Sequence, residues 1–199
     1  MITFVLFSTL ATFYFTMFFT PGPNNAMLTA SGMKFGFIRT LPHLIGITLG
    51  HILQIGLTCL GLANLFLLYP QVQFYMKILC FLYLLYLGWK MIGSFSMIQK
   101  ETGRPLRFYE ASAFQFINPK AWSIAVTVAS GFFPTEENIF VGVLFVVITA
   151  AIINFPVCSL WALFGSGLRK FVNDVKVKKI IEYLLALLLV LTGLFILLK

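Results

Sequence analysis

Charged side chains are scarce in this chain: they make up 10% of its 199 residues, and only six residues are acidic. Hydrophobic residues account for 60%, and the mean hydropathy is +0.96. A soluble domain does not need so large an apolar fraction to build its core. The composition therefore argues against an ordinary soluble domain and predicts a protein that lies in a lipid bilayer.

Thiols and imidazoles are also few. The three cysteines, Cys59, Cys80 and Cys158, lie singly in separate apolar runs without a Cys-x-x-Cys pair, which argues against a thiol–disulfide carrier. The two histidines, His43 and His51, do not have the i, i+4 spacing of a helical ligand pair. We expect no resident metal ion, and export of a metal cation stays an alternative function.

The signatures of an enzyme are missing as well. The apolar runs contain no paired carboxylates and no Ser-His arrangement, and the chain has no glycine-rich loop for binding phosphate. We therefore expect neither enzyme activity nor a cofactor, and no transport driven by ATP.

Long apolar runs determine the predicted architecture. A helix needs about 20 predominantly apolar residues to cross a bilayer, and several runs reach that length. In the second run, Gly46 and Gly50 form a small-xxx-small pair, which favours close helix packing. We predict an all-α integral membrane protein with about six transmembrane helices, at residues 2–32, 44–63, 72–92, 111–133, 139–168 and 180–198.

Basic residues lie in alternate connections between these runs. They follow the first, third and fifth spans, whereas the connections after the second and fourth spans contain none. Because basic residues mark the cytoplasmic side, both termini are predicted outside, in the periplasm. This asymmetry accounts for the net charge of +8, so we expect contact with membrane lipid and no nucleic-acid partner. The residues concerned are Lys34, Arg39, Lys100, Arg104, Arg107 and the cluster 169–179.

The first span is interrupted at Thr20-Pro21-Gly22-Pro23-Asn24-Asn25. Each proline removes a backbone N–H group and clashes with the preceding turn, and the glycine accepts unusual dihedral angles. Proline is also favoured as the first residue of a helix. We therefore predict that one helix ends near Thr20 or Gly22 and that another begins at Pro23.

The fourth span has a matching interruption at Asn118-Pro119-Lys120. Asn118 suits the N-cap and Pro119 the first helical position, which leaves the N–H groups of Lys120, Ala121 and Trp122 without intrahelical acceptors. Such N–H groups attract an anion, for example a substrate carboxylate. Irregular backbone at membrane depth is tolerated only where protein or a water-filled cavity satisfies it. The alternative is a pair of ordinary proline kinks.

The two interruptions divide the chain into similar halves. Each set of three spans opens with a broken helix, and an odd number of spans inverts the second set relative to the first. We predict one transporter domain over residues 1–199, with half-repeats at about 1–95 and 108–199 and a polar linker at 96–107. Paired broken helices at corresponding positions indicate a transporter whose substrate binds between the repeats.

Three stretches resemble the LysE/RhtB family of amino-acid exporters: residues 20–24 (Thr-Pro-Gly-Pro-Asn), 83–89 (Tyr-Leu-Leu-Tyr-Leu-Gly-Trp) and 118–121 (Asn-Pro-Lys-Ala). The resemblance extends over nearly the whole chain. It implies secondary-active efflux of amino acids or closely related metabolites across a bacterial inner membrane, in exchange for protons. The residues alone leave another small organic anion open as the substrate.

Lys120 is the sharpest candidate in the predicted site. An ammonium group within a span is costly unless it meets water, a carbonyl group or a counter-charge, so Lys120 is expected to face the cavity. It can bind a substrate carboxylate, take part in proton coupling with His51, or only fix the topology. The sequence leaves open whether the protein forms a homo-oligomer. The predicted substrate-binding residues are Pro21, Gly22, Pro23, Asn24, Asn25, Asn118, Pro119 and Lys120.

Overall fold

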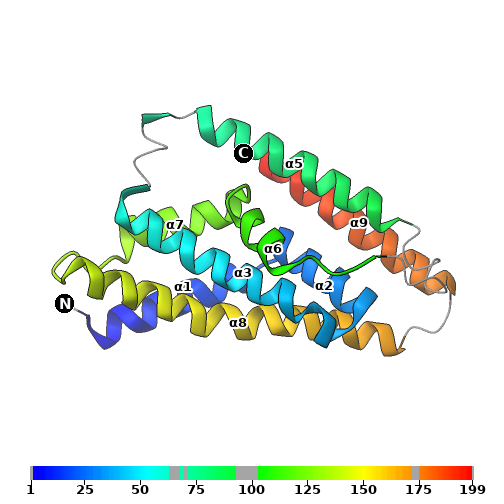
Figure 1. The fold of residues 1–199 in the computed structure, drawn as a ribbon, viewed down its shortest axis with the longest axis horizontal. Helices are drawn as coiled ribbons and strands as arrows, with labels where there is room; N and C mark the ends of the chain where they lie inside the picture. Colours follow the sequence, from blue (N-terminus) through cyan, green and yellow to red (C-terminus); the bar gives the residue numbers. More distant parts are fainter. Residues whose placement is uncertain (1, 63–67, 70, 93–102, 172–174, 199) are drawn as a thin grey trace.

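The structure is a computed structural model that describes residues 2–62, 68–69, 71–92, 103–171 and 175–198. Over these residues the chain forms helices and no strand, which confirms the all-α prediction (Figure 1). Most of the predicted linker at 96–107 lies outside the described residues. The helices are α1 Phe4–Phe19, α2 Pro23–Phe35, α3 Phe37–Leu57, η1 Thr58–Leu62, α5 Gln71–Met91, α6 Phe108–Gln115, α7 Pro119–Gly131, α8 Ile139–Phe171 and α9 Val175–Leu198.

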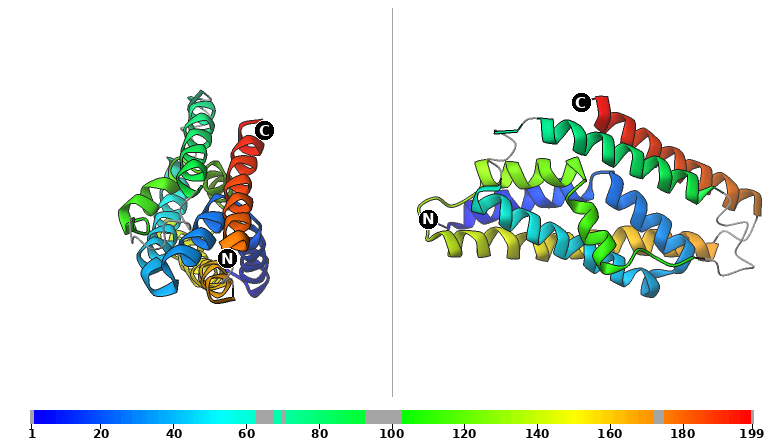
Figure 2. Two further views of the ribbon diagram at one scale, coloured as in Figure 1. Left: turned by 90° about the vertical axis from the view of Figure 1, so that its right-hand side faces the viewer. Right: turned by 45° about the horizontal axis from the view of Figure 1, so that its top comes forward.

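Most of the helices form one compact group, and a pair of helices packs against it. The pair consists of α5 and α9, which run side by side along one side of the molecule (Figures 1 and 2). A buried apolar cluster joins this pair to α2 and α6 through Cys80, Leu84, Met27, Phe114 and Leu189. A second cluster, centred on residues of α1, α3, α7 and α8, fills the interior of the group.

Glycines set the closest helix contacts. A β-carbon at Gly32 of α2 would overlap the carbonyl oxygen of Ala162, and one at Gly165 of α8 would overlap that of Thr29. The predicted small-xxx-small pair, Gly46 and Gly50, also lies at a close contact. A β-carbon at Gly46 would overlap the carbonyl oxygen of Phe108. At Gly50 it would lie 2.8 Å from backbone atoms of Ser112. The α2–α8 and α3–α6 contacts are therefore backbone to backbone.

Two described helices are long and apolar enough to cross a membrane, Phe37–Gly61 and Ile139–Arg169. A third candidate is the pair Phe4–Phe19 and Pro23–Phe35, which is bent by 58°. Helix α5 contains a shorter apolar stretch, Lys77–Trp89. The polar connection predicted around Arg39 is absent, because α3 already begins at Phe37. These findings fit a membrane protein, and the count of six spans stays a prediction.

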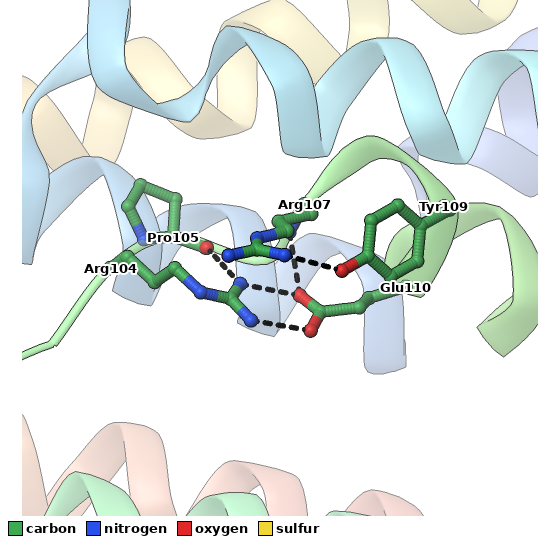
Figure 3. A network of polar contacts seen from close by, with 5 residues as sticks. All are labelled: Arg104, Pro105, Arg107, Tyr109 and Glu110. Carbon is green, nitrogen blue, oxygen red and sulfur yellow. Dashed lines mark hydrogen bonds and ion pairs between the residues drawn. The ribbon is translucent and has the colours of Figure 1, made fainter.

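An ion-pair network attaches residues 104–107 to the start of α6 (Figure 3). The guanidinium of Arg104 donates to both carboxylate oxygens of Glu110, each at 2.6 Å, and the backbone N–H of Arg107 donates to Glu110 at 2.7 Å. The Arg107 side chain donates to the hydroxyl of Tyr109 at 2.7 Å. The hydrogen bond from Arg104, followed by that from Arg107, lowers the pKa of Glu110 to about 2.

Glu110→Gln is expected to remove a pH-dependent part of the thermal stability. Because the folded-state pKa of Glu110 lies below its ordinary value of 4.5, its contribution is present above about pH 4.5 and is lost as the pH falls towards 2. The pair is partly exposed, so the effect is small. Melting temperatures of both proteins in detergent between pH 3 and 7 test this. Equal melting temperatures at pH 7 would contradict it.

Candidate functional site

The two predicted interruptions meet in space. Helix α1 ends at Phe19 and α2 begins at Pro23, while α6 ends at Gln115 and α7 begins at Pro119. The end of α6 tightens through hydrogen bonds between residues three apart, from Phe116, Ile117 and Asn118. Both interruptions border a single cavity of about 20 Å³, which has room for about one water molecule. Its lining is Met17, Phe18, Gly22, Pro23, Asn24, Asn25, His51, Asn118, Lys120, Ala121, Ile124, Asn154 and Cys158.

Lys120 links the second interruption to the first. Its ammonium Nζ donates to the carbonyl oxygen of Thr20 at 2.7 Å, to the Thr20 hydroxyl at 2.9 Å and to the carbonyl oxygen of Pro21 at 3.3 Å. These oxygens lie at the C-terminal end of α1, where the unpaired carbonyls carry partial negative charge. The half-buried lysine therefore bonds to the end of α1, across the cavity from its own helix.

Asn25 holds the end of α1 in place. Its side-chain amide donates to the carbonyl oxygens of Phe18 and Thr20, both at 2.8 Å. Asn25 is buried, and both donor positions of its amide are used inside the protein. In this conformation its role is to satisfy the carbonyls that the interruption exposes.

Asn25→Leu is expected to destabilise the protein by about 1–3 kcal/mol. It removes both hydrogen bonds to α1: the carbonyl of Phe18 loses its side-chain donor inside the protein, whereas the carbonyl of Thr20 still accepts from the ammonium of Lys120. The measurement is thermal or denaturant unfolding in detergent. Ser123→Ala is the control, because the Ser123 hydroxyl is exposed and donates only within its own helix. Equal stability of the two variants would contradict this role.

Asn24 and Gln115 form a reciprocal amide pair between the two interruptions. The Asn24 amide donates to Gln115 Oε1 at 2.8 Å, and the Gln115 amide donates to Asn24 Oδ1 at 3.2 Å. Gln54 of α3 donates to the backbone carbonyl of Gln115 at 3.0 Å. Helices α2, α3 and α6 are thus joined by polar side chains beside the cavity.

His51 lies on α3 at the wall of the cavity. Its Nε2 is 3.4 Å from the amide nitrogen of Asn24, and its ring packs 5.3 Å from that of Phe18. The side chain is 2% exposed, and its Nδ1 has no hydrogen-bond partner among the described residues. A buried ring nitrogen without a partner is costly unless another group or water meets it. The predicted candidates Asn24, His51 and Lys120 therefore share one cavity.

The prediction of free N–H groups at the start of α7 is wrong in this conformation. The side chain of Asn118 accepts from the N–H of Lys120 at 3.1 Å. The backbone carbonyl of Asn118 accepts from Ala121 at 3.0 Å and from Trp122 at 3.2 Å. Asn118 thus caps α7 as predicted, and the N–H groups of Lys120, Ala121 and Trp122 all have an acceptor.

The start of α2 differs from that of α7. Pro23 occupies its first turn, its N-cap is Gly22, and no side chain caps its N–H groups. Gly22, Pro23, Asn24 and Asn25 all line the cavity. The helix start with capacity for an anion is therefore that of α2.

The cavity lining contains one lysine, one histidine and one cysteine as titratable groups, and no carboxylate. Across the described part of the chain, no three His, Cys, Asp or Glu residues lie close enough to hold a metal ion. The lining thus offers amides, a cation, an imidazole and helix ends, a set that suits a small polar solute.

The family model for the LysE type translocator matches residues 15–199, which is most of the chain and includes both interruptions. This protein belongs to the LysE-type translocator family. Family members are membrane transporters and not enzymes, which agrees with the apolar helices of this structure. The predicted family resemblance is confirmed.

Relatives of this LysE-type translocator include three cysteine/O-acetylserine efflux proteins. The protein of Salmonella paratyphi A is 30% identical over 147 residues, covering 73% of this chain and 75% of the relative. That of Shigella flexneri serotype 5b is 28% identical over 162 residues, covering 81% and 83%. That of Escherichia coli O139:H28 is 29% identical over 147 residues, covering 73% and 75%. No solved structure matches.

Sequence reasoning missed two polar residues beside the cavity of this LysE-type translocator. Gln115 and Gln54 are completely buried, and both take part in the amide network. The available signal was an amide side chain within a predicted apolar span, where polar residues commonly bind neighbouring helices. Thr20 was part of the predicted interruption, but its role as an acceptor for Lys120 was not foreseen.

Proposed function

We propose that this protein exports an amino acid or a closely related metabolite across the bacterial inner membrane by secondary-active transport. The substrate binds between the two interruptions. One observation carries this proposal: the ammonium of Lys120, from the second interruption, bonds to the end of α1 at the first, in a cavity shared with Asn24 and His51. Paired helix interruptions at one cavity are typical of secondary transporters.

Helix packing supports the proposed inverted repeat of two halves, at about 1–95 and 108–199. Helix α1 packs on α8, and its counterpart α6 packs on α3. The third long helices of the two halves, α5 and α9, pair with each other. This exchange of partners fits a 3+3 repeat with a central pseudo-twofold axis and supports the proposal of one domain with six spans.

The distribution of charges supports periplasmic termini. The backbone N–H of Ile2 donates to Glu137, so the N-terminal end lies beside the acidic connection at 134–138. At the other end of the molecule, a β-carbon at Gly36 would lie 3.4 Å from the guanidinium of Arg169, and one at Gly103 would lie 3.6 Å from Nζ of Lys34. Lys34 and Arg169, which follow the first and fifth predicted spans, thus lie at one end beside Gly103 of the predicted linker, and we assign this end to the cytoplasmic side.

The cavity chemistry and the relatives support an amino acid as substrate. The relatives from Salmonella, Shigella and Escherichia are named for efflux of cysteine and O-acetylserine, which are both α-amino acids. The lining includes an uncapped helix start, which suits a carboxylate, and beside it lie the carbonyl oxygens at the end of α1, which suit an ammonium group. The same lining holds no metal-binding cluster, so a metal cation is the weaker alternative.

The cavity has room for about one water molecule and none for an amino acid, so the site has to widen before a substrate binds. Transport then requires the halves to separate on one side at a time, as alternating access demands. For coupling to protons, the titratable groups lining the cavity are His51, Lys120 and Cys158. We assign proton coupling to His51, whose ordinary pKa of about 6.5 lies nearest to physiological pH, or to Lys120, which carries the cationic group of the cavity lining.

The test is efflux from cells preloaded with a panel of labelled amino acids that includes cysteine and O-acetylserine. Cells that express the wild type are compared with cells that carry the empty vector, at verified expression. Faster efflux of one or a few panel members is the expected result. Equal efflux of every panel member, with protein present in the membrane, would overturn the proposed substrate class.

A further inference from the structure

The end of α1 has the geometry of a receptor for a primary ammonium group. Three oxygens converge on one nitrogen: the carbonyl of Thr20, the hydroxyl of Thr20 and the carbonyl of Pro21, at 2.7, 2.9 and 3.3 Å from Lys120 Nζ. An ammonium group has three N–H donors and no acceptor, so three oxygens satisfy it completely. The helix dipole of α1 adds partial negative charge at the same place.

The chain makes room for the group that now occupies this receptor. A β-carbon at Gly22 would lie 3.0 Å from both Cδ and Nζ of Lys120. Thr20 and Pro21 are exposed, whereas Gly22 is buried, so the three oxygens lie at the rim of the cavity. A long, flexible lysine side chain can leave such a rim without any movement of the helices.

We propose that the three oxygens of Thr20 and Pro21 form the subsite for the substrate's amino group, and that Lys120 fills this subsite only while it is empty of substrate. This inference rests on the proposed export of an amino acid. Lys120 is then a tethered competitor: the substrate's ammonium group displaces it on binding, and its return favours release of the substrate.

The other side of the same interruption completes a zwitterion site. Three residues beyond Thr20, Pro23 begins α2, whose start has no side-chain cap. His51, 2% exposed, lines the cavity with an Nδ1 that has no partner among the described residues, so a donor or acceptor position is left for a ligand. The interruption thus offers carbonyl oxygens on one side and helix N–H groups on the other, as the two ends of an α-amino acid require.

Binding of three small thiols distinguishes an amino-group subsite at Thr20 and Pro21 from direct binding of the substrate carboxylate by Lys120. Cysteamine carries the amino group without the carboxylate, and 3-mercaptopropionate carries the carboxylate without the amino group. Thiocholine keeps the positive charge of cysteamine but has no N–H donor. Equilibrium binding of each is measured on purified, folded wild type, Lys120→Met and Lys120→Gln under reducing conditions. Lys77→Met is the control, because Lys77 lies on α5, away from the cavity lining.

Removal of the Lys120 ammonium is expected to strengthen cysteamine binding about tenfold. This is the gain expected if Lys120 occupies the subsite about nine tenths of the time in the wild type. Thiocholine gains less than cysteamine, because it shares only the relief of charge repulsion and cannot donate to the three oxygens, and 3-mercaptopropionate gains nothing. Adding Thr20→Val to Lys120→Met removes one of the three acceptors and reverses part of the gain.

Cysteamine binding that is unchanged, weakened or absent in both folded Lys120 variants would overturn the inference. So would a loss confined to 3-mercaptopropionate, which would assign Lys120 to the carboxylate. The proposed function is judged separately by efflux from cells. Export by the wild type without a gain for cysteamine rejects only the amino-group subsite. A gain for cysteamine without export of any amino acid rejects only the substrate class.

Discussion

Lys120→Ala is expected to reduce amino-acid efflux to the level of the empty vector while the protein remains in the membrane. Lys120 provides the one ammonium group among the residues that line the cavity, and it joins the two interruptions through three hydrogen bonds. Hydrogen bonds to charged groups contribute about 1.5–3 kcal/mol, so the loss of the lysine that returns to these oxygens as substrate leaves slows transport by roughly ten- to a hundredfold.

The matched control for this variant is Lys77→Ala. It removes a lysine from α5 without touching the cavity, so efflux is expected to stay at the wild-type level. The amount of each protein in the membrane is measured in the same cells. Wild-type efflux in Lys120→Ala would show that Lys120 has only a topological role and would remove it from the transport mechanism.

Gly165→Ala is expected to prevent normal packing of α8 on α2. A β-carbon at this position would overlap the carbonyl oxygen of Thr29 and approach its carbonyl carbon within 2.8 Å. The obstacle is backbone on both sides, so no side-chain rotation relieves it. Overpacking of a core costs about 1–3 kcal/mol, and a rigid backbone contact places this variant at or above the upper end.

Gly167→Ala provides the control two residues away on the same helix. Nothing lies within 4 Å of a β-carbon there, and alanine is favoured over glycine in a helix by about 1 kcal/mol. We therefore expect a lower melting temperature for Gly165→Ala and an equal or higher one for Gly167→Ala, measured in detergent. Similar melting temperatures for the two variants would contradict the backbone contact between α2 and α8.

Local sequence signals predicted the features that local chemistry controls. The Pro-Gly-Pro stretch stops one helix and starts another, because proline lacks the N–H donor and suits the first turn. The structure ends α1 at Phe19 and begins α2 at Pro23. Asn118 caps α7 as its residue type suggests. The all-helical class and the family followed from composition and from the motifs around these prolines.

Partners that are distant in the sequence could not be predicted. The Asn24–Gln115 pair joins residues 91 positions apart, and the Lys120–Thr20 pair joins residues 100 apart. No periodic pattern encodes such contacts, because they depend on how the helices pack. Lys120 was expected to meet water, a carbonyl or a counter-charge, and the carbonyl groups of α1 are what the fold brings to it.

The packing of α2 on α8 was missed for a related reason. Gly32 and Gly165 are 133 residues apart, and nothing in the sequence pairs the one with the other. Gly46 and Gly50, spaced four residues apart on α3, carry a signal within one helix. The six-span inverted repeat and the assignment of the site remain predictions, for which the exchanged packing of α1 and α6 is the strongest support.

The central claim is that an amino acid crosses the membrane through the cavity between the two interruptions. The most direct test uses purified protein in liposomes loaded with a labelled amino acid that cells export. We predict rapid release from liposomes with the wild type, and release at the rate of protein-free liposomes with Lys120→Ala. Equal release from wild-type and protein-free liposomes for every amino acid in the panel, with folded protein inserted, would contradict the claim.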